Sequence, residues 1–238
     1  MGPLATVDFM AKIIRNTPAQ CDQDHISMVA CVAAEIPDRN AAIRGDGQDP
    51  LPAMRSALRS LEAAGVHRIA IPCNTAHLWY AALQSQTDVE ILHIADAVMN
   101  RLSLSGPGSV GILATTSTIA SGLYQHRLAG QERAFMVPSA SDQKRLMTAI
   151  RLVKAGQVAQ ATEILVPLAV GLVGSGCVAV VMACTEIPVA LADVDRALAM
   201  CLIDATDALA QTCVQACLTN SKGATPDKAA RCCIDGTH

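Results

Sequence analysis

Apolar positions follow two alternating spacings along the chain. Short runs rich in β-branched residues are typical of buried strands, and they lie at 27–32, 68–72, 90–93, 110–114, 134–138, 177–182 and 200–203. Between them, apolar residues recur every three or four positions, as on one face of a helix, over 3–15, 52–64, 117–128, 141–154, 158–173 and 205–217. The alternation of strands with helices predicts an α/β protein with parallel sheets.

The pattern also repeats itself. One predicted strand ends in Cys73, which Asn74 and Thr75 follow, and a later strand ends in Cys184, which Thr185 follows. This repeat predicts two similar lobes, each a parallel sheet flanked by helices, related by a pseudo-twofold axis. Ligands of parallel sheets bind beyond the carboxyl ends of the strands, so we expect the two thiols to share the cleft between the lobes.

The predicted units are a first lobe over 1–103, a second lobe over 104–204, a helix at 205–218 that packs back on the first lobe, and a polar tail over 219–238. The two lobes differ at their starts. The second has the strand 110–114 ahead of its first turn, whereas the first opens directly at the turn Met1-Gly2-Pro3. We therefore expect the first lobe to lack its own first strand, through a misassigned start or a truncation.

Composition narrows the class of protein. Apolar residues make up 51% of the chain and charged residues 16%, which favours a folded chain with a sizeable core. A net charge of −3 and an aromatic content of 2% argue against nucleic-acid binding. No apolar run is long enough to cross a membrane, and no secretory signal is evident, so a cytoplasmic protein is expected.

Ten cysteines occur in the chain, and most lie inside apolar runs. In a cytoplasmic protein they are expected to be reduced core residues. Cys213, Cys217, Cys232 and Cys233 lack the paired spacing of zinc knuckles, so no metal site is predicted. Cys73 and Cys184 differ from the others because polar residues follow each of them at a strand end.

Two opposed thiols suit one type of chemistry. A proton removed from one face of a carbon and returned to the other needs an acid/base group on each side, and a thiol has a pKa that neighbouring donors can tune. Asn74, Thr75 and Thr185 are candidate donors beside the thiols, and Thr116 and Thr118 lie on the turn after strand 110–114.

Several segments, taken together, resemble the aspartate/glutamate racemase family. Residues 71–77 (IPCNTAH) and 182–188 (MACTEIP) are similar to its two signature motifs, and 1–6 (MGPLAT) resembles the end of its first strand and turn. Residues 36–39 (IPDR) and 153–156 (VKAG) resemble its carboxylate-binding segments. The resemblance extends to about residue 217.

The resemblance implies a homodimeric enzyme that needs no pyridoxal phosphate or other cofactor and interconverts L- and D-aspartate, or glutamate, in the cleft between two lobes. It implies that Cys73 and Cys184 are the catalytic pair. Asn74, Thr75 and Thr185 would hold the α-amino and α-carboxylate groups of the small-molecule substrate. Arg39 and Lys154 would hold carboxylates.

Other interpretations stay open at this point. His77 could tune Cys73 or simply cap a helix, and Glu186 could orient the second thiol or favour a helix N-terminus. The chain could be another isomerase of the superfamily, such as a hydantoin racemase or a maleate cis–trans isomerase, or a malonate-type decarboxylase. It could also be a catalytically inactive protein that binds amino acids.

Overall fold

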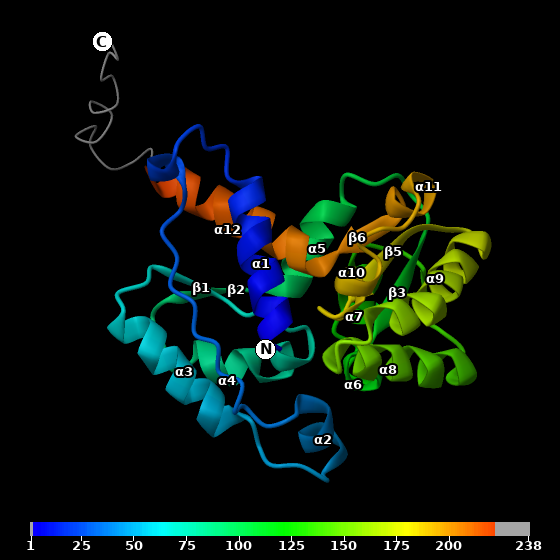
Figure 1. Ribbon diagram of the computed structural model, residues 1–238, viewed down its shortest axis with the longest axis horizontal. Coiled ribbons are helices and arrows are strands. Elements are labelled where there is room, and N and C mark those ends of the chain that lie inside the picture. Colours follow the sequence, from blue (N-terminus) through cyan, green and yellow to red (C-terminus); the bar gives the residue numbers. More distant parts are fainter. Residues whose placement is uncertain (1, 222–238) are drawn as a thin grey trace.

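The computed structural model describes residues 2–221, and Figure 1 shows two parallel sheets with helices around them. The larger sheet has the strand order β4-β3-β5-β6, and all three pairings are parallel. Its strands are β3 (Ser109–Ala114), β4 (Phe135–Met136), β5 (Cys177–Ala183) and β6 (Leu202–Asp204). The smaller sheet pairs β1 (Arg68–Ala70) with β2 (Glu90–Leu92), also in parallel. This architecture confirms the predicted α/β class with two lobes.

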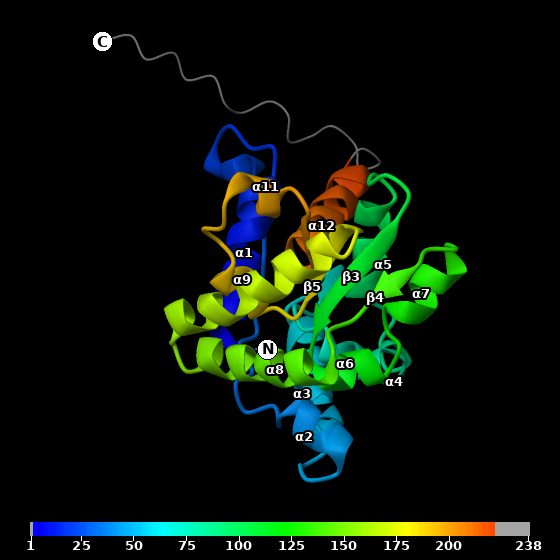
Figure 2. The same cartoon turned by 90° about the vertical axis from the view of Figure 1, so that its right-hand side faces the viewer.

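Helices cover both faces of the larger sheet, which is why its central strands are apolar at nearly every position. Val110, Ile112 and Ala114 of β3 pack in the core that contains α5 (Ile94–Leu102) and α12 (Ala205–Ser221). Leu113 points the other way, into the core formed with α8 (Ala140–Lys154) and α9 (Val158–Gly174). The two layers can be followed on opposite sides of β3 and β5 in Figure 2.

The first lobe surrounds the smaller sheet. Its other elements are α1 (Pro3–Asn16), η1 (Asp22–Asp24), α2 (Arg39–Arg44), α3 (Leu51–Ala63), η2 (Thr75–Trp79) and α4 (Tyr80–Gln84). The last helix, α12, packs along α1 and also contacts β1 and β2. Buried Lys12 of α1 forms an ion pair with Asp8 and a second one, 2.6 Å long, with Asp204 at the end of β6. This network ties the first lobe to the larger sheet.

Two predicted elements are wrong. Residues 27–32 form no strand, because a strand needs a hydrogen-bonded neighbour and β1 has only β2 beside it among the described residues. The single helix predicted over 117–128 is two helices, α6 (Thr116–Ala120) and α7 (Gln125–Gly130). Gly122 lies between them with φ +70°, a left-handed conformation that interrupts a helix.

The carboxyl-terminal prediction falls partly outside the described residues. Helix α12 continues to Ser221, three residues into the expected tail of 219–238, and Cys232 and Cys233 lie beyond the part described.

The remaining short helices are α10 (Ile187–Ala190) and α11 (Arg196–Ala199). Between residues 2 and 221, no helix is both long and apolar enough to span a bilayer.

Candidate active site

A small cavity lies where the carboxyl ends of β1, β3 and β5 meet. The residues that follow these strands supply most of its wall, as expected for parallel sheets. Its volume is about 20 Å³, and it is lined by Gly2, Arg39, Asn40, Cys73, Asn74, Thr75, Thr115, Ile150, Lys154, Cys184, Thr185 and Glu186. The structure thus brings both predicted thiols to one cavity, from different sheets.

Cys184 is held in its protonated form. It follows β5, it is buried, and its Sγ donates to Oε2 of Glu186 at 2.9 Å. The Thr185 hydroxyl donates to the same oxygen at 3.3 Å. Burial, then Glu186, and then Cys73 raise the pKa of the Cys184 thiol well above its usual value. At neutral pH Cys184 is therefore a proton donor. It lies close enough to Cys73 for the charge of a Cys73 thiolate to raise the pKa of Cys184.

Cys73 occupies the loop between β1 and η2. Its backbone N–H donates to the carbonyl of Ile71 at 2.7 Å, and its carbonyl is 2.9 Å from Nδ1 of His77. The Ile94 N–H donates to Nε2 of His77 at 3.1 Å, so Nδ1 carries the ring proton and donates to Cys73. Burial lowers the pKa of His77 to about 3. His77 is therefore neutral, and it holds the backbone of Cys73 in place without adding positive charge.

The side chain of Asn74 lies in the cavity wall and is fixed at one end. Its Oδ1 accepts a hydrogen bond from the hydroxyl of fully buried Tyr124. Asn74 itself is 2% exposed, and its Nδ2 has no hydrogen-bond partner among the described residues. Buried polar groups are nearly always hydrogen-bonded, so an amide left over in the cavity wall is suited to a ligand oxygen.

Three threonine hydroxyls form a buried triangle beside the cavity. Thr75, Thr115 and Thr118 lie 2.9–3.0 Å apart through their Oγ1 atoms. Thr75 and Thr115 line the cavity, whereas Thr118 lies behind them and orients Thr75. Thr116 is exposed, its hydroxyl accepts from Gln143, and it lies outside the cavity wall.

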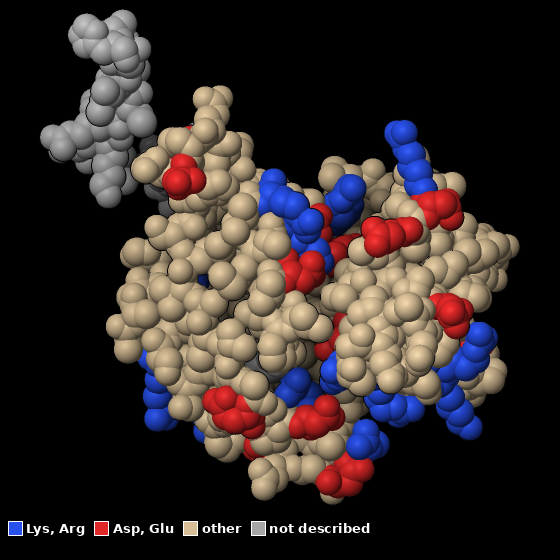
Figure 3. Space-filling view, viewed as in Figure 1, with Lys and Arg blue, Asp and Glu red and all other residues tan. Residues whose placement is uncertain are grey.

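Charged groups close the cavity from two lobes. Arg39 begins α2, and its Nη1 donates to the carbonyls of Ile36 at 2.9 Å and Pro37 at 2.8 Å, which fixes the guanidinium. Lys154 ends α8, and its Nζ lies 3.7 Å from Oδ2 of Asp38. Figure 3 shows side chains of both signs gathered along the seam between the two halves of the molecule.

Asp38, the partner of Lys154 at the edge of the cavity, stays ionised. Burial opposes its charge, but the Ala41 N–H at 2.9 Å and the nearby Lys154 outweigh burial and lower the pKa of the Asp38 carboxyl.

The sequence analysis did not predict Asp38 or Thr115 as site residues. Asp38 adjoins Arg39 in the 36–39 motif, and Thr115 stands three residues before Thr118, which is the spacing of a helix cap, so both had a local signal.

Comparison with known proteins identifies the family. The family model for Asp/Glu/hydantoin racemases matches residues 1–213. The chain belongs to this family. An aspartate racemase from Picrophilus torridus superposes with a TM-score of 0.78 and 31% identity, covering 93% of this chain and 90% of that one. The chain is therefore a racemase, an enzyme of the isomerase class.

Two further relatives show how far the likeness extends. The broad specificity amino-acid racemase RacX of Bacillus subtilis is 31% identical over 136 residues, which are 55% of this chain and 58% of RacX. A glutamate racemase from Francisella tularensis, solved with D-glutamate, has a TM-score of 0.59 at 16% identity, covering 96% of this chain and 82% of that one. The likeness to the Francisella enzyme concerns the fold alone.

Proposed function

We propose that this racemase interconverts the L and D forms of a dicarboxylic amino acid, aspartate first and glutamate second, by proton transfer between Cys73 and Cys184. One observation carries the proposal: the two thiols line a single cavity from the ends of strands in different sheets. Racemisation needs an acid/base group on each side of Cα, and a cleft between two lobes supplies two sides.

The proton balance uses only these two groups. Cys73 as a thiolate takes the Cα proton, which leaves a carbanion conjugated with the substrate carboxylate. The Cys184 thiol then delivers its proton to the opposite face and becomes a thiolate. In the reverse direction the roles exchange, and no bond to a cofactor is formed. The protonated state of Cys184 in the free protein suits the first of these directions.

The wall offers donors for the charge that develops on the carboxylate. The unpartnered Nδ2 of Asn74 is fixed by Tyr124, and the hydroxyls of Thr75 and Thr185 are close by. Hydrogen-bond donors fixed in advance stabilise a developing oxyanion more than mobile water does, because they need not reorganise during the reaction.

Two cations in the wall support the choice of a dicarboxylic substrate. A monocarboxylic amino acid needs one cationic partner, whereas Arg39 and Lys154 approach the cavity from different lobes. Guanidinium can grip one carboxylate with two parallel bonds, and ammonium can hold the other as a point charge. The P. torridus relative is an aspartate racemase, which agrees with this choice.

The cleft must open to admit this substrate. A volume of about 20 Å³ is room for about one water molecule. The Lys154–Asp38 pair spans the mouth, so its separation would both widen the cleft and free the ammonium for a substrate carboxylate. Closure around the substrate would then exclude water from the carbanion.

Cysteine substitution followed by isotope exchange tests the mechanism. Cys73→Ser and Cys184→Ser should each lower racemisation of aspartate in deuterated water by about a thousandfold or more, with no added pyridoxal phosphate. Each variant should still exchange the Cα proton of one enantiomer, and the two variants should differ in which one. Cys201→Ser, a cysteine outside the cavity, is the control and should keep full activity.

Three results would contradict the proposal. They are full activity in either cysteine variant, activity only after addition of pyridoxal phosphate, and turnover of a 5-substituted hydantoin with no turnover of free amino acids. We also propose that the enzyme is a cytoplasmic homodimer. Sedimentation velocity of the purified protein gives its mass in solution and so tests the homodimer.

A further inference from the structure

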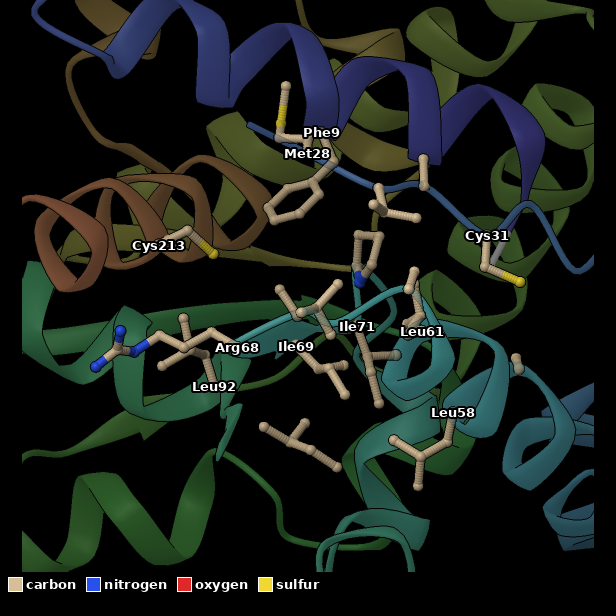
Figure 4. Close-up of a pocket in the computed structure, with 18 of the residues that line it drawn as sticks. Phe9, Met28, Cys31, Leu58, Leu61, Arg68, Ile69, Ile71, Leu92 and Cys213 are labelled. Atoms are coloured by element: carbon tan, nitrogen blue, oxygen red, sulfur yellow. The ribbon is translucent and has the colours of Figure 1, made fainter. Parts of the chain in front are cut away.

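A hollow larger than the thiol cavity lies in the first lobe, and neither thiol lines it. Its volume is about 480 Å³, and Figure 4 shows apolar side chains such as Phe9, Leu58 and Ile69 around it. The thiol cavity is smaller and is lined mostly by polar side chains. An amino acid carries two charged groups on its α-carbon, and burying charge in apolar surroundings is costly, so the thiol cavity is the better place for it.

Unpartnered polar atoms distinguish the two hollows further. Between residues 2 and 221, six buried side-chain polar atoms have no hydrogen-bond partner. None belongs to a residue that lines the larger hollow, whereas two belong to the wall of the thiol cavity, Nδ2 of Asn74 and Oδ1 of Asn40. Buried polar groups are nearly always hydrogen-bonded, so this donor and this acceptor are both suited to a polar ligand.

Asn40 reaches the thiol cavity from α2. It is the second residue of this helix and half-buried, and α2 contacts η2 of the first lobe and α6 of the second. The side chain of Arg39, just before it, donates to two backbone carbonyls, and the N–H of Ala41, just after it, donates to Asp38 at 2.9 Å. The backbone that carries Asn40 is therefore held on both sides.

Only one group of an aspartate substrate can donate to Oδ1 of Asn40. Ionised carboxylates accept hydrogen bonds and cannot donate them, so this oxygen would repel both carboxylates. The α-ammonium group has three N–H donors and no acceptor. The carboxylates have suitable partners elsewhere in the wall, in the cations of Arg39 and Lys154 and in the free N–H of Asn74.

We propose that Asn40 binds the α-ammonium group of the substrate through Oδ1, and so makes the enzyme select amino acids over dicarboxylates that lack the amino group. This inference rests on the proposed function, since it takes the substrate to bind between the thiols. Asn74, Asn40 and the two cations then hold the three heavy substituents of Cα. The fourth position, which carries the proton, is left to the thiols.

A neutral acceptor at position 40 has a chemical advantage. The positive charge of the ammonium group stabilises the carbanion that forms on the neighbouring carbon. A carboxylate in place of the Asn40 amide would bind the ammonium group more tightly, but its negative charge would repel the carbanion. The amide accepts the hydrogen bond without adding that repulsion. Asn40→Asp is therefore expected to separate binding from catalysis.

Two ligands that differ only in the ammonium group test the inference. Calorimetry with racemic aspartate, whose composition turnover does not change, and with succinate gives the preference for the amino acid as a ratio of dissociation constants. Asn40→Leu should lower this preference about tenfold, through weaker binding of aspartate alone. Asn40→Asp should raise the preference and lower kcat about tenfold. Asn100→Leu, at an exposed position of α5, is the control and should change neither quantity.

The isosteric variant decides the question if Asn40→Leu does not fold, because a fall of the preference in Asn40→Asp would overturn the inference. An unchanged preference in the variants of Asn40 would overturn it too. Failure of the dicarboxylate assignment gives a different result: the parent then prefers alanine to propionate but not aspartate to succinate. The same variants, measured with alanine and propionate, test Asn40 in that case. A parent that prefers neither amino acid would overturn both proposals.

Discussion

At the scale of single residues, the two thiols differ in their surroundings. Cys184 is buried and donates to the carboxylate of Glu186, whereas Cys73 is only half-buried and is positioned through its backbone by His77. Equivalent positions in a repeated motif thus have different surroundings, and those of Cys184 raise the pKa of its thiol. A racemase can use this asymmetry, because one thiol begins as the acid when the other begins as the base.

Glu186→Gln tests the electrostatic part of this asymmetry. After burial, Glu186 contributes most to the raised pKa of Cys184. Removing its charge should lower that pKa, because the thiolate no longer faces a carboxylate. The rate of alkylation of Cys184 against pH, measured in a Cys73→Ser background, should reach its midpoint at lower pH in the variant. Glu163→Gln, at an exposed position of α9, is the control, and an unmoved or higher midpoint in Glu186→Gln would contradict this account.

At the scale of elements, His77 connects two parts of the first lobe. Its ring donates to the carbonyl of Cys73 after β1 and accepts from the N–H of Ile94 at the start of α5. The bond from Ile94 requires the neutral ring, because a protonated Nε2 cannot accept, and burial lowers the pKa of His77 to about 3. In the unfolded chain the pKa is about 6.5. The folded state therefore binds fewer protons than the unfolded state between these values.

Stability should accordingly fall on acidification. Unfolded chains take up a proton at His77 below about pH 6.5 and folded chains do not until about pH 3, so this residue lowers the free energy of unfolding by about 1.4 kcal/mol per pH unit within that window. His77→Gln should remove that contribution and flatten the dependence, as measured by urea unfolding at several pH values from neutral to mildly acidic. His67→Gln, at an exposed position, should leave the slope unchanged. An unchanged slope in His77→Gln would show that the ring is protonated in the folded state.

At the scale of the whole molecule, the site exists only where the lobes meet. Arg39 belongs to α2 of the first lobe and Lys154 to α8 beside the larger sheet, and the Lys154–Asp38 pair joins the two. The buried pairs of Lys12 with Asp8 and Asp204 join the same halves at another point. Substrate selection is thus expected to depend on both lobes at once.

Arg39→Ala and Lys154→Ala test that dependence. Each should lower kcat/KM for aspartate about a hundredfold, because a charge-assisted contact in a closed cleft is lost. Turnover of alanine, which has no second carboxylate, should be low in the parent and change much less. Arg44→Ala lies on the same helix but pairs with Asp46 at the surface, so it should have little effect. If alanine is turned over as well as aspartate in the parent, or if neither substitution matters, the dicarboxylate assignment is wrong.

Local patterns were sufficient for much of this protein. The apolar runs at 110–114 and 177–182 match β3 and β5 to within a residue at each end, because strands buried on both faces are apolar at nearly every position. The repeated motif led to Cys73 and Cys184, since a cysteine followed by polar residues at a strand end is recognisable without knowledge of the rest of the chain. The fold class, and the placement of Cys73 and Cys184 at one cavity, were therefore predictable from the order of residues alone.

Tertiary structure decided what depends on a distant partner. The run at 27–32 has a strand's composition but forms none, because ladder hydrogen bonds require a neighbour that the local sequence does not specify. The raised pKa of Cys184 arises first from burial, Tyr124 fixes Asn74 from fifty residues away, and the Lys154–Asp38 pair joins residues far apart in the chain. Sequence determined which groups the protein has, and packing determined which of them are charged, paired or left available to a substrate.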